Sequence, residues 1–416
     1  MNCILFEDRA VSQMYPIVLA RPAYGITCGG FRLAELVSQA FKACRGVVRH
    51  HLGALQAQNQ PQLHETPLAD DQPTLLLNAR LVPRVQTLAA LQSWIASGQP
   101  GIVQHAGQLV AALLPAGHRV PSARVTYDEF LAFAEALQPT AKLPARDEAF
   151  EVFQYAHDVV RFNEEIIHEN LEFRLKQGAY REIRDGLFAA GEISLGENVV
   201  IDASHGPILV EEGASIGPFC FLRGPAYLGR NVKVIEHSAI KDAVSLGHTT
   251  KIGGEVEATI IEPYSNKQHH GFLGHSYLGS WINLGAGTSN SDLKNTYGTV
   301  NMEYPSGRVA TNMQFVGSIF GDYSKTAINT GIFTGKTIGV CSMLYGFVTT
   351  NVASFVNYAR LFGQVTELPP EVMISTQQRM FQRRSVEQTP ADIQLIHDMY
   401  LLTQEERQLT GEPLVF

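Results

Sequence analysis

The chain has 416 residues, enough for roughly two to three domains. Hydrophobic residues make up 45% and charged residues 17%, a composition that excludes collagen-like, coiled-coil and disordered chains. The formal net charge is −8 and there is no long basic run, so we expect neither a nucleic-acid binder nor a membrane binder.

The N-terminal segment lacks a basic region followed by a long apolar stretch, so we expect neither a signal peptide nor a transmembrane span. The five cysteines are widely spaced, odd in number and without a CxxC pair. This usage indicates reduced, buried thiols and a cytoplasmic location.

Residues 1–145 alternate strand and helix patterns. Strands are predicted at Asn2–Phe6 and Thr74–Leu77, and helices at Phe31–Cys44 and Tyr127–Leu137. This alternation predicts a Rossmann-type α/β domain whose ligands bind at the carboxyl ends of the strands.

Residues 146–190 are an amphipathic, charged stretch and are expected to form a helical linker. Residues 191–360 carry hexapeptide repeats, which predict a parallel β-helix. Aliphatic residues recur at every sixth position: Val210, Ile216, Leu222, Leu228, Val234, Ile240, Leu246 and Ile252. Hexapeptide solenoids coil left-handed. Residues 361–416 return to helical character, with a helix expected to begin near Thr389–Pro390.

Three hexads close one triangular coil, and coils stack at about 4.8 Å, the spacing of hydrogen-bonded strands. Arg223 and Lys241 are eighteen residues apart, so they are expected one coil apart on the same edge. Two stacked cations repel each other unless an anion neutralises them, and a sugar phosphate would be such an anion. The alternative is that Arg223 and Lys241 are two unrelated surface cations.

The polar stretch 288–313 is expected to leave the prism and reach a neighbouring subunit, with a simple disordered loop as the alternative.

The segment from Tyr264 to Tyr297, with KIGGEVE, YSNK and LKN, resembles the acetyltransferase half of GlmU-type bifunctional enzymes in a divergent bacterial branch. The first domain resembles the sugar-nucleotidyltransferase half of these enzymes through three motifs, ILFED, LARP and LLLNARLVP. The resemblance implies acetyl transfer from acetyl-CoA to the amine of an amino-sugar 1-phosphate, followed by coupling to a nucleoside triphosphate for UDP-N-acetylglucosamine-type synthesis. It also implies a homotrimer with acetyl-transfer sites between neighbouring prisms.

The same resemblance assigns roles to individual residues. His269 aligns with the catalytic base, and imidazole, with a reference pKa near ~6.5, suits proton removal from an attacking amine. The alternative is that His269 and His270 are solvated loop residues. A zinc site built from His269, His270 and His275 is less favoured, because no cysteine or carboxylate cluster lies nearby in the sequence. The remaining aligned residues are Arg223 and Lys241 for the phosphate, Asn283 and Lys294 for the sugar, and Ser318 for the cofactor.

Some positions depart from the family pattern. Phe272 and Asp292 stand where the family has a tyrosine and an asparagine, so the sugar could be held differently. The coils between Lys241 and His269 are lengthened by an amount that is not a whole coil. Whether Arg223 and Lys241 reach the same site as His269 is therefore left open.

The first domain lacks an intact LxxGxGTRM loop, and its metal is unknown. Asn78 stands where an aspartate would bind Mg²⁺, and an amide is a poor ligand for this ion. Arg21 and Arg32 could replace lost charge, and Gly29–Gly30 offer flexible backbone. An active, Mg²⁺-dependent domain and a degenerate scaffold both remain possible.

Three functions follow from these patterns. The first is an amino-sugar acetyltransferase, fused to a sugar-1-phosphate nucleotidylyltransferase. The second is a nucleotidylyltransferase with a β-helix that only oligomerises, and the third is a non-catalytic trimeric scaffold. The presence of His269, Asn283 and the LKN motif favours the first function over the third. The loss of the LxxGxGTRM loop argues against the second.

Overall fold

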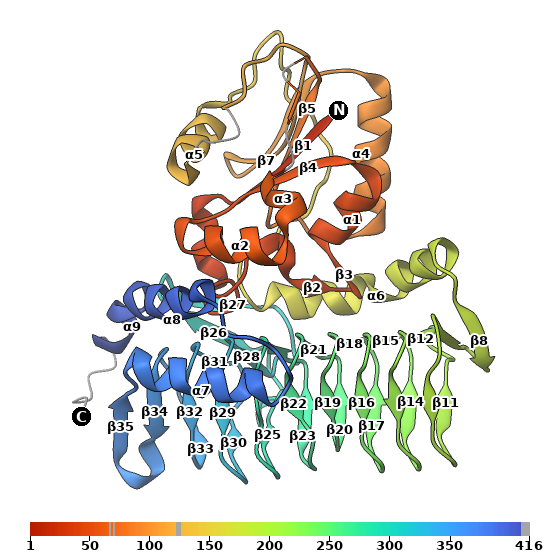
Figure 1. Ribbon diagram of the computed structural model, residues 1–416, viewed down its shortest axis with the longest axis vertical. Helices are drawn as coiled ribbons and strands as arrows, with labels where there is room; N and C mark the ends of the chain where they lie inside the picture. Colours follow the sequence, from red (N-terminus) through yellow and green to blue (C-terminus); the bar gives the residue numbers. More distant parts are fainter. Residues whose placement is uncertain (66–67, 70, 122–125, 409–416) are drawn as a thin grey trace.

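The computed structural model describes residues 1–65, 68–69, 71–121 and 126–408. The last residues of the expected C-terminal segment, 409–416, and three short pieces of the first domain lie outside this description. An α/β domain sits on one side of a long β-helix, with helix α6 (Asp158–Gln177) between them (Figure 1).

The N-terminal domain is built on one sheet in the order β4-β1-β5-β7-β6. Strands β4, β1 and β5 are parallel, and β7 and β6 add an antiparallel edge. The strands are β1 (Asn2–Phe6), β4 (Ala43–Val47), β5 (Thr74–Asn78), β6 (Gly101–His105) and β7 (Gln108–Leu114). The helices are α1 (Leu33–Ala40), α2 (Gly53–Asn59), α3 (Pro61–Glu65), α4 (Val85–Ser97) and α5 (Tyr127–Ala136), and β2 (Thr27–Cys28) pairs with β3 (Phe31–Arg32).

One predicted helix is shorter than expected. The pattern over Phe31–Cys44 predicts a single helix, but α1 ends at Ala40 and Cys44 lies in β4. Cys44 pairs in register with Cys3 of β1, and both thiols are buried. Tertiary strand pairing therefore overrides the local helical pattern.

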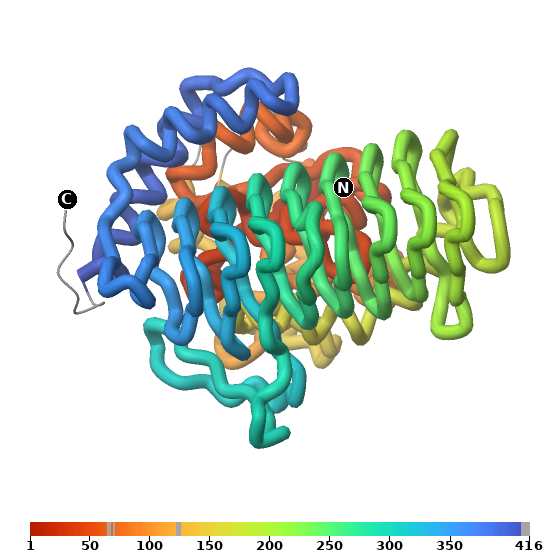
Figure 2. Tube along the Cα trace, turned by 90° about the horizontal axis from the view of Figure 1, so that it is seen from below, coloured from red at the N-terminus to blue at the C-terminus, as the bar shows by residue number. Residues whose placement is uncertain are grey.

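The second half is a left-handed β-helix with three faces, seen edge-on as stacked coils in Figure 2. The domain face consists of β8 (Arg181–Arg184), β9 (Leu187–Ala189), β12 (Ile208–Val210), β15 (Ala226–Leu228), β18 (Val244–Leu246), β21 (Ile260–Ile261), β24 (Tyr277–Leu278), β28 (Ser318–Phe320) and β31 (Lys336–Ile338). The lysine face consists of β10 (Ser194–Leu195), β13 (Ser215–Ile216), β16 (Lys233–Val234), β19 (Lys251–Ile252), β22 (Asn266–Lys267), β29 (Lys325–Thr326), β32 (Met343–Leu344), β34 (Val356–Ala359) and β35 (Gln364–Glu367). The open face consists of β11 (Val200–Asp202), β14 (Phe221–Arg223), β17 (Ala239–Lys241), β20 (Glu255–Glu257), β23 (Phe272–Gly274), β25 (Ser289–Asn290), β30 (Gly331–Ile332) and β33 (Phe347–Val348).

The period-six residues fill the prism. All eight positions from Val210 to Ile252 are at most 3% exposed and belong to one apolar cluster. Burial of these stacked aliphatic side chains is the main force that holds the coils together. The predicted hexapeptide prism is confirmed.

Helix α6 and the N-terminal domain cover the domain face. Ile167 and Leu171 of α6 pack on Leu209 of β12. Asn163 accepts from the Gly29 amide at 2.9 Å and donates to the Ala243 carbonyl at 2.6 Å, so it links the two domains. The two domains are therefore packed against each other through a buried interface, in addition to being joined by the linker.

The polar stretch after β25 leaves the prism as predicted and forms a hairpin of β26 (Asn301–Tyr304) and β27 (Gly307–Ala310), the cyan arm of Figure 2. Within its own chain, this arm packs on the residues that precede α6. The Tyr304 hydroxyl lies 2.7 Å from the His157 ring, and Tyr304 packs on Tyr155. The arm therefore folds back onto its own chain.

The C-terminal segment forms α7 (Pro370–Gln382), α8 (Pro390–Leu402) and α9 (Gln404–Gln408). Thr389 caps α8 through a capping box with Asp392. All five cysteines are free and buried. Among the described residues, no helix is both long and apolar enough to cross a membrane.

Candidate active site

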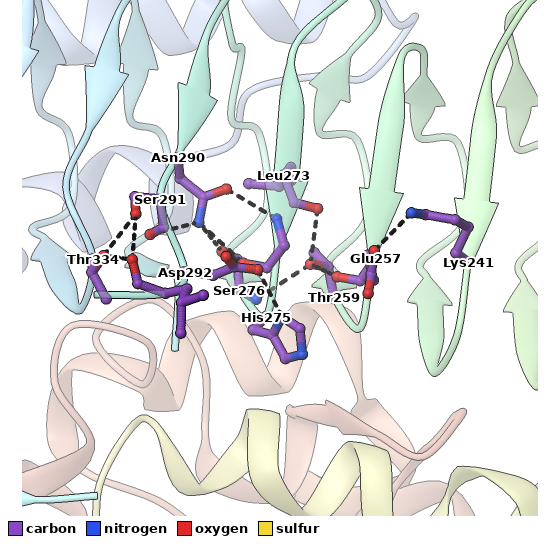
Figure 3. A network of polar contacts seen from close by, with 12 residues as sticks. Lys241, Glu257, Thr259, Leu273, His275, Ser276, Asn290, Ser291, Asp292 and Thr334 are labelled. Atoms are coloured by element: carbon purple, nitrogen blue, oxygen red, sulfur yellow. Dashed lines mark hydrogen bonds and ion pairs between the residues drawn. The ribbon is translucent and has the colours of Figure 1, made fainter. Parts of the chain in front are cut away.

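A row of charged side chains follows the edge where the open face turns into the domain face. Lys241 pairs in register with Glu257, and Glu257 with Gly274, the residue before His275. The neighbouring pair Leu222–Ile240 puts Arg223 one coil before Lys241. We call Arg223, Lys241, Glu257 and His275 the charged edge; most of it is drawn in Figure 3.

The two cations of the charged edge lie on adjacent coils, but carboxylates of the chain already neutralise them. Arg223 Nε is 2.8 Å from Asp242 Oδ1. Lys241 Nζ is 2.6 Å from Glu255 Oε1 and 2.8 Å from Glu257 Oε2. Carboxylates of the chain itself therefore relieve the repulsion between these cations, and phosphate binding by Arg223 and Lys241 stays a prediction.

His275 is the best-positioned imidazole of this edge. Its Nδ1 lies 2.8 Å from Asp292 Oδ2, its Nε2 lies 3.9 Å from Glu164 Oε1, and its ring stacks on Phe315 at 5.0 Å. The side chain is 12% exposed. Burial opposes the charged ring, but the hydrogen bond to Asp292 and the charge of Glu164 outweigh it and raise the pKa of His275.

This arrangement leaves Nε2 available for proton transfer. A carboxylate bonded to Nδ1 selects the tautomer with a proton on that nitrogen, so the neutral ring accepts a proton at Nε2. The turn that carries His275 is held on both sides. Gly274 N donates to Asn290 Oδ1 at 2.9 Å, and Ser276 N donates to Thr259 Oγ1 at 3.2 Å (Figure 3).

Ser318 lies beside Ser276 in the interior of the β-helix, on the domain face. Its amide donates to Ser276 Oγ at 2.9 Å, and its side chain is fully buried. The Ser318 hydroxyl is therefore enclosed by its own chain, and its contact with the cofactor stays a prediction.

The other predicted acetyl-transfer residues lie elsewhere in a single chain. His269 is exposed at the opposite end of β23 from His275, at the corner with the lysine face. Asn283 is exposed on the lysine face between Asn266 and Lys325. Lys294 lies on the arm, where its Nζ donates to the Thr299 carbonyl at 2.5 Å. The structure does not bring these three to Arg223 and Lys241.

In the first domain, the expected nucleotide-site residues are also separated. Asn78 ends β5 at the carboxyl edge of the sheet, where its amide donates to Asp8 Oδ2 at 2.8 Å and to the Leu109 carbonyl at 3.0 Å. Arg21 lies instead at the domain junction, buried against Asp322 and 3.1 Å from Glu262 Oε2.

The side chains at this sheet edge do not fit Mg²⁺. Asp8 accepts two bonds from Arg80 at 2.8 and 2.6 Å, and Glu7 is 3.0 Å from Arg49 Nε. A hard dication needs free carboxylate oxygens, and these are already used by arginines. Among the described residues, no group of three or more His, Cys, Asp or Glu side chains could hold a metal ion.

Sequence reasoning missed the His275–Asp292 pair, although a signal was present. The two residues are 17 apart, which is one coil at the spacing that separates Glu257 from Gly274. In the sequence, Asp292 stands out only because the family has an asparagine at this position. Glu164 could not be linked to this site, because it comes from α6.

Comparison with known proteins agrees with this two-part organisation. Residues 3–178 match the family described as sugar nucleotidyl transferase. The bifunctional sugar-1-phosphate nucleotidylyltransferase/acetyltransferase of Sulfurisphaera tokodaii is 27% identical over 148 residues, which are 35% of this chain and 37% of that protein. The bifunctional protein GlmU of Azorhizobium caulinodans is 30% identical over 116 residues, 27% of this chain and 26% of that protein. The UDP-N-acetylglucosamine acyltransferase structure from Francisella novicida aligns at 14% identity with a TM-score of 0.34, over 56% of this chain and 79% of that one.

The fold and the family match define a class: proteins with a nucleotidyltransferase-type α/β domain fused to a left-handed β-helix. Within that class, the resemblance to GlmU-type bifunctional proteins is confirmed, at low identity. The chain matches 37% of the length of the Sulfurisphaera tokodaii protein and 26% of the length of the Azorhizobium caulinodans protein, so it spans well under half of either relative.

Proposed function

We propose that the chain is an amino-sugar-1-phosphate N-acetyltransferase that takes its acetyl group from acetyl-CoA. The observation that carries the proposal is the His275–Asp292 pair at the edge of a hexapeptide β-helix. The names of the curated relatives, which include acetyltransferase activity, supply the reaction class.

The chemistry requires one base. The sugar amine attacks the thioester carbonyl, the new N–C bond forms and the C–S bond breaks. The amine proton passes to His275 Nε2, and the imidazolium returns it to the departing thiolate. Asp292 stabilises the charged ring during the transfer, because it bonds the opposite nitrogen at 2.8 Å.

His269 is the competing base. It lies at the other end of β23 from the charged edge. His269 can therefore meet a charged edge only if the two come from neighbouring prisms. Thiol release from acetyl-CoA with glucosamine 1-phosphate tests the function, and the His275→Asn and His269→Asn variants decide between the rings. Absence of thiol release with every amino-sugar phosphate tried would refute the proposal.

A homotrimer is part of the proposal. The open face exposes large apolar side chains toward its C-terminal end, with Phe347 at 57% and Phe333 at 52% exposed. Exposed apolar side chains that share one surface favour contact with another protein surface. A second copy of this prism, as in the family that the chain resembles, fits this face.

The second candidate function is sugar-1-phosphate nucleotidylyl transfer by the first domain. The family match over residues 3–178 favours it. The arginine-paired carboxylates at the sheet edge favour a binding or scaffolding role instead. Pyrophosphate release from each nucleoside triphosphate, with Mg²⁺ and an acetylated sugar phosphate, is the test.

A further inference from the structure

A cavity of about 460 Å³ lies between the two domains, on the opposite edge of the domain face from His275. Its size is within the range of small-molecule sites, about 300–1,000 Å³. Gly30, Arg32 and Glu35 line it from the first domain, and Glu211, Arg230 and His248 line it from the β-helix. None of these six residues belongs to the charged edge.

One end of the cavity is cationic. Arg230 and His248 follow β15 and β18, which pair in register through Leu228 and Leu246, so they lie on adjacent coils. Arg32 lines this end from the first domain; its side chain is 34% exposed, and its Nη2 lies 3.3 Å from Glu262 Oε2. In the described part of the chain, the exposed Arg230 has no carboxylate partner, unlike Arg223 of the charged edge. Burial and the charges of Arg32 and Arg230 lower the pKa of His248, which agrees with a positive field at this end.

The other end supplies hydrogen-bond acceptors. Glu211 lies two coils before Gly247, about 10 Å away at ~4.8 Å per coil. Its carboxylate is fixed by the hydroxyls of Tyr180 at 2.6 Å and Tyr227 at 3.1 Å. Glu35 is 2.6 Å from Arg174 and remains 40% exposed. Arg174 is packed between the Phe31 and Tyr227 rings, which makes this end rigid.

We infer that this cavity binds a phosphorylated sugar. The phosphate lies among Arg32, Arg230 and His248, and the sugar hydroxyls donate to Glu35 and Glu211. Charge-assisted hydrogen bonds to phosphate are strong, and carboxylates are pure acceptors that suit hydroxyl donors. Because the ligand touches both domains, its binding stabilises their contact. The inference does not depend on acetyl transfer.

Calorimetric titration of the full chain without an acyl donor tests the inference. The probes are glucose 1-phosphate, glucosamine 1-phosphate, the free sugars and inorganic phosphate. We expect both sugar phosphates to bind more tightly than inorganic phosphate, and the free sugars not to bind. Arg230→Gln is expected to weaken sugar-phosphate binding by about tenfold or more, because it removes a charged hydrogen bond.

The matched control is Lys233→Gln, an exposed cation on the same coil, which should leave affinity unchanged. Glu211→Gln should weaken binding of the sugar phosphates but not of inorganic phosphate. Three results would each overturn the inference: no binding by the wild type, equal affinity for inorganic phosphate, or equal losses in Arg230→Gln and Lys233→Gln. Thermal unfolding of the unliganded variants checks that they are folded. Glucose 1-phosphate has no amine that could be acetylated, so its failure to bind leaves the thiol-release assay unaffected and the two proposals stand or fall separately.

Discussion

His275 Nδ1 and Asp292 Oδ2 lie 2.8 Å apart, although their residues are 17 positions apart in the chain and leave the open face on successive coils. The coil repeat brings them together, and Glu164 of α6 completes the surroundings of the ring at 3.9 Å. An ordered imidazole is suited to proton transfer when a carboxylate holds its Nδ1 and its Nε2 lies at 3.9 Å, beyond hydrogen-bond distance, from the next carboxylate oxygen.

The first prediction concerns the base. His275→Asn should lower kcat for thiol release by about 10²–10⁴-fold, because general-base catalysis contributes that much. His269→Asn should leave kcat close to the wild-type value, since His269 lies at the other end of β23. The reverse result would return the catalytic role to His269 and require a site shared between prisms.

The second prediction concerns pH. The folded pKa of His275 is raised above its ordinary value, near ~6.5, by Asp292 and Glu164 against the effect of burial. The stability that this ion pair contributes is therefore fully present below about pH 6.5 and is lost as the pH rises through the folded pKa. Asp292→Asn should lower the pKa of His275 in an NMR titration and destabilise the protein more at about pH 6 than at about pH 9. An unchanged titration of His275 would contradict the pairing.

The third prediction concerns the domain junction. Arg21 is buried against the carboxylates of Asp322 and Glu262. Arg21→Met should destabilise the fold by about 3–5 kcal/mol, because it leaves the buried carboxylate of Asp322 without its cation, whereas Glu262 keeps Arg32 at 3.3 Å. Urea unfolding measures the change. Arg9→Met, which removes a surface pair with Glu135, is the control and should leave the midpoint unchanged. Similar losses in both variants would contradict this account.

The fourth prediction concerns assembly. Light scattering coupled to size-exclusion chromatography should give the mass of a trimer for the wild type. Phe347→Asp should release monomers, because it places a charge on the exposed apolar part of the open face. Phe347→Leu keeps that surface apolar and should remain trimeric. A monomeric wild type would refute the proposed assembly.

The fifth prediction concerns the first domain. With Mg²⁺ and any nucleoside triphosphate, we expect no pyrophosphate release, because arginines occupy the carboxylates of Glu7 and Asp8. A GlmU-type enzyme with an intact loop serves as the positive control. Release above the background with one nucleotide would show that these ion pairs open in the presence of substrate.

The interior of the β-helix and the position of several helices can be predicted from the amino-acid pattern alone. Period-six aliphatic residues such as Ile240 can be buried together only in a three-sided prism, and capping residues such as Thr389 mark helix starts locally. These features depend on neighbours within one coil or one turn, so a linear pattern records them.

The contacts between side chains at the corners and between the domains follow from the three-dimensional packing and not from the linear pattern. Lys241 pairs with Glu257 after 16 residues and Glu257 with Gly274 after 17, so a strict repeat of eighteen misplaces every later corner residue. Arg21 and Asp322 are 301 residues apart, and no periodicity links them. The physical reason is that apolar burial fixes the inward positions of each coil, whereas corner length and domain packing set the outward positions, where the proposed sites lie.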